Sequence, residues 1–158
     1  MQKLITITHS QINVFDILEP DFNLWDNNHV AQGFSWRGGH VSFGVPDHDG
    51  QCLVETHLVE SFPPFEEKIL RAIRVPISAS ANLFVASTVD EYQTDIPKGD
   101  YEIEFRLSLG NLEHKTFPHT FLIDFFFKNS TEKTFSILRK SDEMTSDKVL
   151  TTVAKPAI

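Results

Sequence analysis

Apolar and polar side chains alternate most clearly over residues 101–109. The polar positions are Glu102, Glu104, Arg106 and Ser108, and the apolar ones are Tyr101, Ile103, Phe105, Leu107 and Leu109. Successive side chains of a strand point to opposite faces, so this pattern predicts a strand with one buried face and one solvated face. Pro97 and Gly99 suit the second and third positions of a type II turn, which would begin the strand.

Shorter segments with the same pattern follow one another along most of the chain. Strands are predicted over residues 33–37, 40–45, 51–60, 69–77, 83–89, 92–96 and 133–139, and residues 4–8 and 11–16 form one bulged strand or two short ones. Residues 121–127 are almost all apolar, which is typical of a central strand covered on both faces. Gly38 and Gly39 separate two strands, as in a tight hairpin.

One short helix is expected near residue 30. Asp26 or Asn27 can cap its N-terminus, and Gly33 can end it in the left-handed conformation after one or two turns. With so little helix and so many short strands, the sequence predicts an all-β protein, an antiparallel β-sandwich of about 8–10 strands with one short helix. We expect residues 1–140 to form a single β-sandwich domain, and residues 141–158, which lose the periodicity, to form a loosely packed or partly disordered C-terminal tail.

Cysteine content and hydropathy narrow the class of protein. Cys52 is the only cysteine, so no internal disulfide can form and a disulfide-stapled secreted domain is excluded. The N-terminal residues alternate in polarity and lack the apolar run of a signal peptide. No segment approaches the roughly 18 to 20 apolar residues that a membrane-spanning helix needs, so we expect a cytoplasmic protein with no membrane span.

The net charge of −8 is unevenly distributed. Residues 1–67 carry ten Asp or Glu against two Lys or Arg, whereas the remaining residues carry twelve of each. Such a balance argues against direct binding of nucleic acid, whose phosphates would be repelled. It favours a basic partner or a metal ion, unless the charge serves solubility alone.

Acidic residues gather in two parts of the sequence, and charge placement makes them the candidates for partner binding. The candidates are Asp21, Asp26, Asp90, Glu91, Asp95, Glu102 and Glu104. Glu102 and Glu104 share one strand face, so their like charges repel unless a nearby cation neutralises them. Arg106 on that same face can neutralise them within the protein, or a basic partner can do so from outside.

Candidate metal ligands and nucleophiles form no complete set. Asp47 and Asp49 are followed by Gly50, like the start of a calcium loop, but the rest of an EF-hand is missing and the sequence also suits an ordinary turn. With Asp21 and Asp26, these residues keep open an alternative calcium site built from several loops. The seven histidines lack the spacing of a zinc motif. Cys52 lies in a strand and faces the core, and no nucleophile elbow is present, so neither an enzyme nor a cofactor is expected.

Three segments, taken in order, resemble one known family. They are residues 5–15, the Trp25–Asp26 turn with the following helix and Gly39-His40-Val41-Ser42-Phe43, and Ile96-Pro97-Lys98-Gly99-Asp100-Tyr101. This order is similar to that of the ComJ-like competence proteins, inhibitors of the DNA-entry nuclease of naturally transformable bacteria. The resemblance runs over residues 5–109 and continues more weakly to residue 124.

The resemblance implies a small acidic β-sandwich that binds and silences a nuclease. An acidic surface can occupy the basic groove of a nuclease by electrostatic complementarity, with fast, steered association. A ligand- or calcium-binding β-sandwich remains the alternative. The sequence makes no prediction of oligomeric state or of which face binds the partner.

Overall fold

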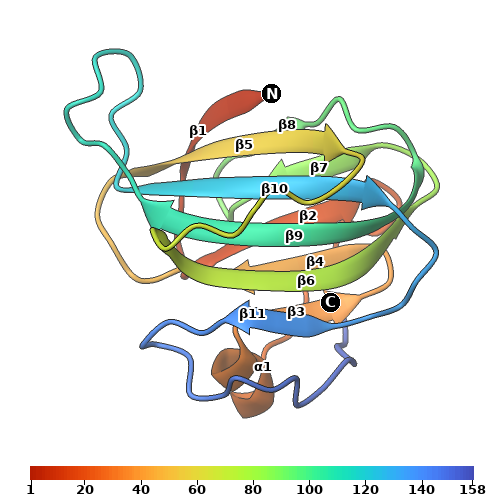
Figure 1. The fold of residues 1–158 in the computed structure, drawn as a ribbon. Coiled ribbons are helices and arrows are strands. Elements are labelled where there is room, and N and C mark those ends of the chain that lie inside the picture. Colours follow the sequence, from red (N-terminus) through yellow and green to blue (C-terminus); the bar gives the residue numbers. More distant parts are fainter.

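The computed structural model describes residues 1–158 as two β-sheets packed face to face, with one short helix at their side (Figure 1). The six-stranded sheet has the order β1-β5-β10-β9-β6-β11. Its strands are β1 (Gln2–Thr6), β5 (Gln51–Val59), β6 (Ile69–Ala79), β9 (Gly99–Leu109), β10 (Phe121–Asn129) and β11 (Ser136–Arg139). The predicted all-β sandwich with one short helix is confirmed, because 11 strands and a single helix are present.

The five-stranded sheet has the order β3-β4-β2-β7-β8. Its strands are β2 (Gln11–Asp16), β3 (Phe34–Arg37), β4 (His40–Gly44), β7 (Leu83–Ala86) and β8 (Glu91–Gln93). All strand pairs are antiparallel except β5 with β10, which run parallel in the middle of the six-stranded sheet. The predicted hairpin around Gly38 and Gly39 is present, with Arg37 of β3 paired to His40 of β4.

The first two strands belong to different sheets, so residues 4–16 are not one bulged strand. β1 pairs with β5, whereas β2 pairs with β4 and β7. The chain crosses between the layers at His9 and Ser10, which have positive φ angles of 58° and 53°. Residues other than Gly are strained in this conformation, so the backbone at the crossing is conformationally restricted.

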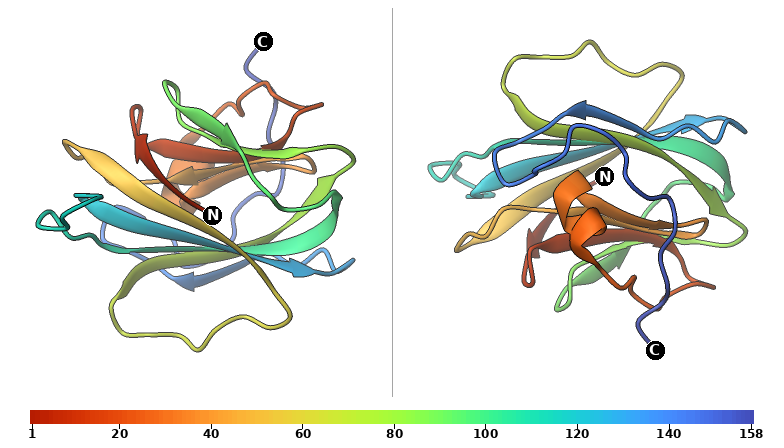
Figure 2. Two further views of the ribbon diagram at one scale, coloured as in Figure 1. Left: turned by 90° about the horizontal axis from the view of Figure 1, so that it is seen from above. Right: turned by 90° about the horizontal axis from the view of Figure 1, so that it is seen from below.

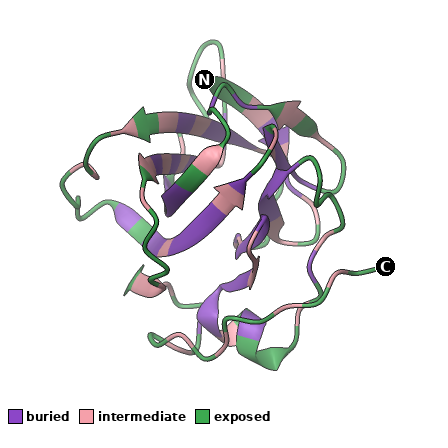
Figure 3. Ribbon diagram, turned by 90° about the vertical axis from the view of Figure 1, so that its right-hand side faces the viewer, coloured by how far each residue is buried: buried purple, intermediate pink, exposed green.

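The core lies between the two sheets and is rich in aromatic rings. Phe43 of β4 stacks on Phe105 of β9 with ring centres 4.8 Å apart, and Phe125 of β10 packs against both. The buried residues lie mainly on the strands, and the exposed residues mainly on the connecting loops (Figure 3). The apolar positions 101, 103, 105 and 107 of β9 all face this core, as the alternation predicts.

The helix α1 (Asn27–Gln32) has the predicted caps. Asp26 accepts hydrogen bonds from the backbone of Asn28 and His29, and Gly33 adopts φ 83°. Six residues of helix are far too few to cross a bilayer, and the chain has no other helix.

The outer face of β9 is not solvated, so that part of the prediction is wrong. Glu102 and Glu104 are 5% and 0% exposed, because residues 60–68, which connect β5 to β6, cross over this face (Figures 1 and 2). Arg106 donates to the carbonyls of Pro63 and Pro64 and so holds the connection in place. The alternation identified the two faces of the strand correctly, but it could not show that a loop covers the second one.

Residues 141–158, expected from the sequence to be a C-terminal tail, lie beside α1 and make hydrogen bonds to it (Figure 2). Met144 is 1% exposed and belongs to the core. Gln32 of the helix accepts hydrogen bonds from the backbone of Leu150 and Thr151 and donates to the Thr151 carbonyl. The segment lacks periodicity because polar side chains and backbone groups of α1 hold it, rather than a sheet.

Candidate functional site

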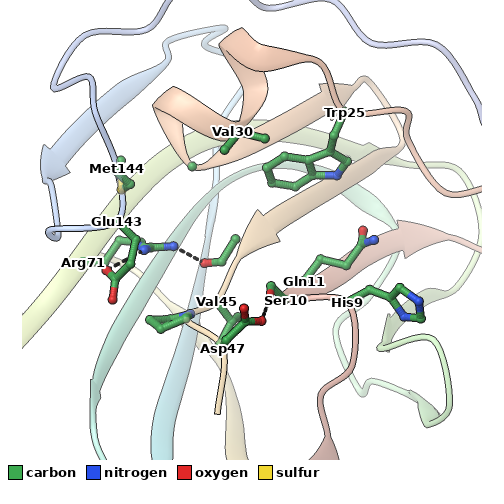
Figure 4. Close-up of a pocket in the computed structure, with 13 residues that line it drawn as sticks. His9, Ser10, Gln11, Trp25, Val30, Val45, Asp47, Arg71, Glu143 and Met144 are labelled. Atoms are coloured by element: carbon green, nitrogen blue, oxygen red, sulfur yellow. Dashed lines mark hydrogen bonds and ion pairs between the residues drawn. The ribbon is translucent and has the colours of Figure 1, made fainter.

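A pocket of about 380 Å³ opens between the β1–β2 crossing, α1 and the C-terminal segment (Figure 4). His9, Ser10 and Gln11 line one side, and Trp25 and Met144 line the other parts. The strained crossing between the sheets therefore forms one wall of this pocket. Such strain is often found at binding sites, where the surrounding structure holds it in place.

Arg71 of β6 is the buried charge of the pocket, with a side chain that is 4% exposed. Its Nη1 donates to the carbonyl of Gly44 over 2.5 Å, its Nε donates to Ser141 over 2.8 Å, and its Nη2 lies 3.3 Å from the Glu143 carboxylate. Burial lowers the pKa of Arg71, although Glu143 opposes this shift. The arginine thus ties the C-terminal segment to both sheets and has few free donors for a ligand.

Two polar atoms of the pocket lining are buried without a hydrogen-bond partner from the protein. They are Nε1 of Trp25, a donor, and Oε1 of Gln11, an acceptor. At the mouth, the hydroxyl of Ser10 donates to Asp47. Each of these two atoms lacks a protein partner, and a buried water molecule could supply one.

The acidic residues proposed from the sequence do not form one surface. Asp90, Glu91 and Asp95 surround β8, which is one edge of the five-stranded sheet. Asp21 and Asp26 lie in the connection before α1, and Arg37 of β3, at the opposite edge, donates to the Asp21 carbonyl.

Several of these acids already have structural contacts. Asp26 caps the helix, and Asp90 accepts a hydrogen bond from the backbone of Thr6 over 2.7 Å. Glu104 is paired with Arg74 and Arg106. Asp21, Glu91 and Asp95 are exposed, and their side chains make no ion pair or hydrogen bond within the protein. Glu102 makes none either, but it is buried.

Asp47 and Asp49 are not joined by a third metal ligand in this structure. Asp47 accepts from Ser10, and the Asp49 carbonyl accepts from Thr120, as in an ordinary loop. The cluster of Glu55, His57 and Asp124 is the group of ligands that sequence reasoning did not find. The spacing of Glu55 and His57 places them on one strand face, but only the β5–β10 register brings Asp124 beside them.

Cys52 is unsuited to nucleophilic catalysis. It is fully buried, and burial raises the pKa of its thiol to about 12. His48 approaches it, with Nε2 3.4 Å from Sγ, but the thiolate form that attacks a substrate is strongly disfavoured. This agrees with the placement of Cys52 in a strand that faces the core.

Comparisons with known proteins give one family and one solved structure. The family described as Competence protein J (ComJ) has a sequence model that matches residues 4–128, which confirms the resemblance found in the sequence. The fold is similar to that of the crystal structure of ComJ, inhibitor of the DNA degrading activity of NucA, from Bacillus subtilis. The TM-score is 0.64 at 18% identity, over 80% of this chain and 95% of that one. A search of curated protein sequences finds no match.

Proposed function

This chain belongs to the competence protein J (ComJ) family, and from that premise we propose that it is a non-enzymatic protein inhibitor of a DNA-degrading nuclease. The observation that carries the proposal is the family match over residues 4–128, which spans both sheets. The likeness of the fold to an inhibitor of NucA supports it. The burial of Cys52 is consistent with a binding role rather than catalysis.

We propose further that the inhibitor approaches a basic nuclease through its acidic surface. The exposed acids near β8, Glu91 and Asp95, are the strongest candidates, because neither carboxylate is held by another group of the protein. Asp21 at the opposite edge is the second candidate surface. Since the two lie at different edges of one sheet, variants of each can show which edge faces the nuclease.

The test of inhibition is plasmid degradation by purified NucA, and by the related nuclease of the source organism, with increasing amounts of this chain. We expect stoichiometric inhibition of at least one of the two enzymes, and a complex of the two proteins in size-exclusion chromatography. Full nuclease activity in the presence of excess folded chain, for both enzymes, would refute the proposal.

The test of the acidic surface compares association rates at low and high salt. We expect Glu91→Gln/Asp95→Asn to slow association several-fold at low salt and to have little effect at high salt, since salt screens exposed charges. Glu113→Gln/Glu132→Gln is the matched control, because it removes two exposed acids from other loops. Equal slowing by both pairs would show that net charge matters and that the β8 edge has no special role.

A further inference from the structure

Two neighbouring strands bring a histidine and two carboxylates together on the outer face of the six-stranded sheet. Glu55 and His57 are two residues apart on β5. Their neighbours Val54 and Thr56 are buried in the core, so Glu55 and His57 point to the opposite, outer face of the sheet. The parallel register places Asp124 of β10 directly opposite Glu55. This cluster lies on the opposite side of the six-stranded sheet from the aromatic core, and it shares no residue with the pocket.

The three ligand atoms of the cluster lie close enough together to converge on one ion. His57 Nε2 lies 3.0 Å from Asp124 Oδ1 and 3.8 Å from Glu55 Oε2, and the ligand atoms all lie within 4.8 Å of one another. Two atoms bound about 2.1 Å from one metal ion are about 3.0 Å apart in cis octahedral geometry and about 3.4 Å apart in tetrahedral geometry. Small side-chain rotations are therefore enough to place all three on one ion.

The side chains around the cluster hold it in this arrangement. Phe126 stacks on the His57 ring, with centres 4.8 Å apart and planes 18° from parallel. Gln2 of β1 donates to the second oxygen of Glu55 over 2.5 Å. Such contacts orient metal ligands before the metal binds, and they reduce the ordering cost of binding.

The charges of the cluster also favour a cation. Two carboxylates on adjacent strands repel one another unless a positive charge lies between them. Arg106 pairs with Asp124 across the β9–β10 ladder, but its side chain bonds to Glu104 and to the carbonyls of Pro63 and Pro64. His57, Glu55 and Asp124 are 38%, 27% and 20% exposed, so an ion can reach them from solvent.

We propose that Glu55, His57 and Asp124 bind one divalent first-row transition metal ion, with zinc preferred over magnesium and calcium. The ligands are Nε2 of His57 and one oxygen of each carboxylate, and water fills the remaining positions. An imidazole nitrogen in the set selects for zinc-like ions, because magnesium and calcium prefer all-oxygen sites. The ion joins the only parallel strand pair of the protein and does not depend on the proposed nuclease partner.

The test is calorimetric titration of the metal-free full chain with ZnCl₂, MgCl₂ and CaCl₂. The protein for this titration is prepared without an N-terminal affinity tag, because Gln2 contacts Glu55. We expect one zinc ion per chain and no measurable binding of magnesium or calcium. His57→Gln and Asp124→Asn each weaken zinc binding about tenfold or more, and zinc raises the melting temperature of the wild type but not of Asp124→Asn.

His48 and Cys52 are a pair of zinc-ligand types outside the proposed site, with Nε2 3.4 Å from Sγ. His48→Gln is therefore the matched control, and it should bind zinc as the wild type does. Cobalt adds a second readout, since ligation by Cys52 would produce a thiolate charge-transfer band that the proposed site cannot give.

Three results would overturn the proposal. These are unchanged zinc affinity in both His57→Gln and Asp124→Asn, loss of binding in His48→Gln, and equal binding of magnesium. The melting curve of each variant without metal establishes that it is folded, and Glu55→Gln replaces either variant that is not.

Discussion

Glu104 offers the sharpest test of the buried outer face, because its carboxylate is 0% exposed and meets two arginines. Arg74 donates to it over 2.9 and 2.6 Å, and Arg106 over 2.5 Å. Glu104→Gln keeps the shape of the side chain but removes its charge, and the new amide NH₂ group would face the N–H donors of an arginine. Breaking a buried ion pair costs about 3–5 kcal/mol, since the remaining charge stays buried without a partner.

The geometry selects the lower end of that range. Arg74 is 30% exposed, so its charge can be solvated after the substitution, whereas Arg106 is 8% exposed and cannot. We therefore expect Glu104→Gln to lower the free energy of unfolding by about 3 kcal/mol. That is a large part of the stability of a domain of this size, which is typically about 5–15 kcal/mol.

The measurement is urea unfolding followed by tryptophan fluorescence. Glu66→Gln is the matched control, because Glu66 and Lys68 form an ion pair that is 59% and 65% exposed. An exposed pair contributes little, so this control should change stability by less than about 0.5 kcal/mol. If the two variants lost equal stability, the Glu104 carboxylate would have to be solvated, and residues 60–68 would not cover it.

Three further predictions concern pH, packing and thiol reactivity. Burial by itself would raise the pKa of Asp16, but hydrogen bonds from Ser80 and Leu18 outweigh it and lower the pKa below the ordinary 3.8. The wild type should therefore have a higher free energy of unfolding than Asp16→Asn at pH values above the ordinary pKa, and this difference should disappear as the pH falls through the folded-state pKa. A difference that persists in strong acid would contradict this. Met144→Ala should lower the free energy of unfolding by about 2–5 kcal/mol and expose residues 145–158 to limited proteolysis, whereas a protease-resistant variant would show that other contacts hold the segment. Cys52 should react with Ellman's reagent only on unfolding, because burial raises its pKa to about 12, and rapid reaction in native buffer would disprove its burial.

Local chemistry made the strands, the hairpin and the helix caps predictable from the sequence. A strand has a side-chain period of two, so the pattern at residues 101–109 determines which side chains share a face. Asp26 and Gly33 act through the backbone beside them, and the structure uses them as the helix caps that the sequence indicated. These signals depend on neighbours in the sequence and do not require knowledge of the tertiary fold.

The remaining features depend on contacts between distant segments. The carbonyls of Pro63 and Pro64 meet Arg106 across more than forty residues, and no pattern in either segment specifies the other. The same holds for the cluster of Glu55, His57 and Asp124, which requires the parallel pairing of β5 with β10. Residues 141–158 lack a strand pattern because backbone hydrogen bonds to α1, and one buried methionine, fix their path.

The burial of Glu102 and Glu104 also separates two roles that charge can have in binding. Their contacts with a partner are blocked by residues 60–68, and Asp26 and Asp90 are engaged by the backbone. Long-range steering, however, depends on the summed charge, and the net charge remains −8 whatever the local pairing. Under the proposed function, few of the candidate acids are therefore left to make direct contacts, while the whole chain still attracts a basic nuclease. Salt should then act mainly on the association rate, and the lifetime of the complex should depend on the uncharged part of the interface.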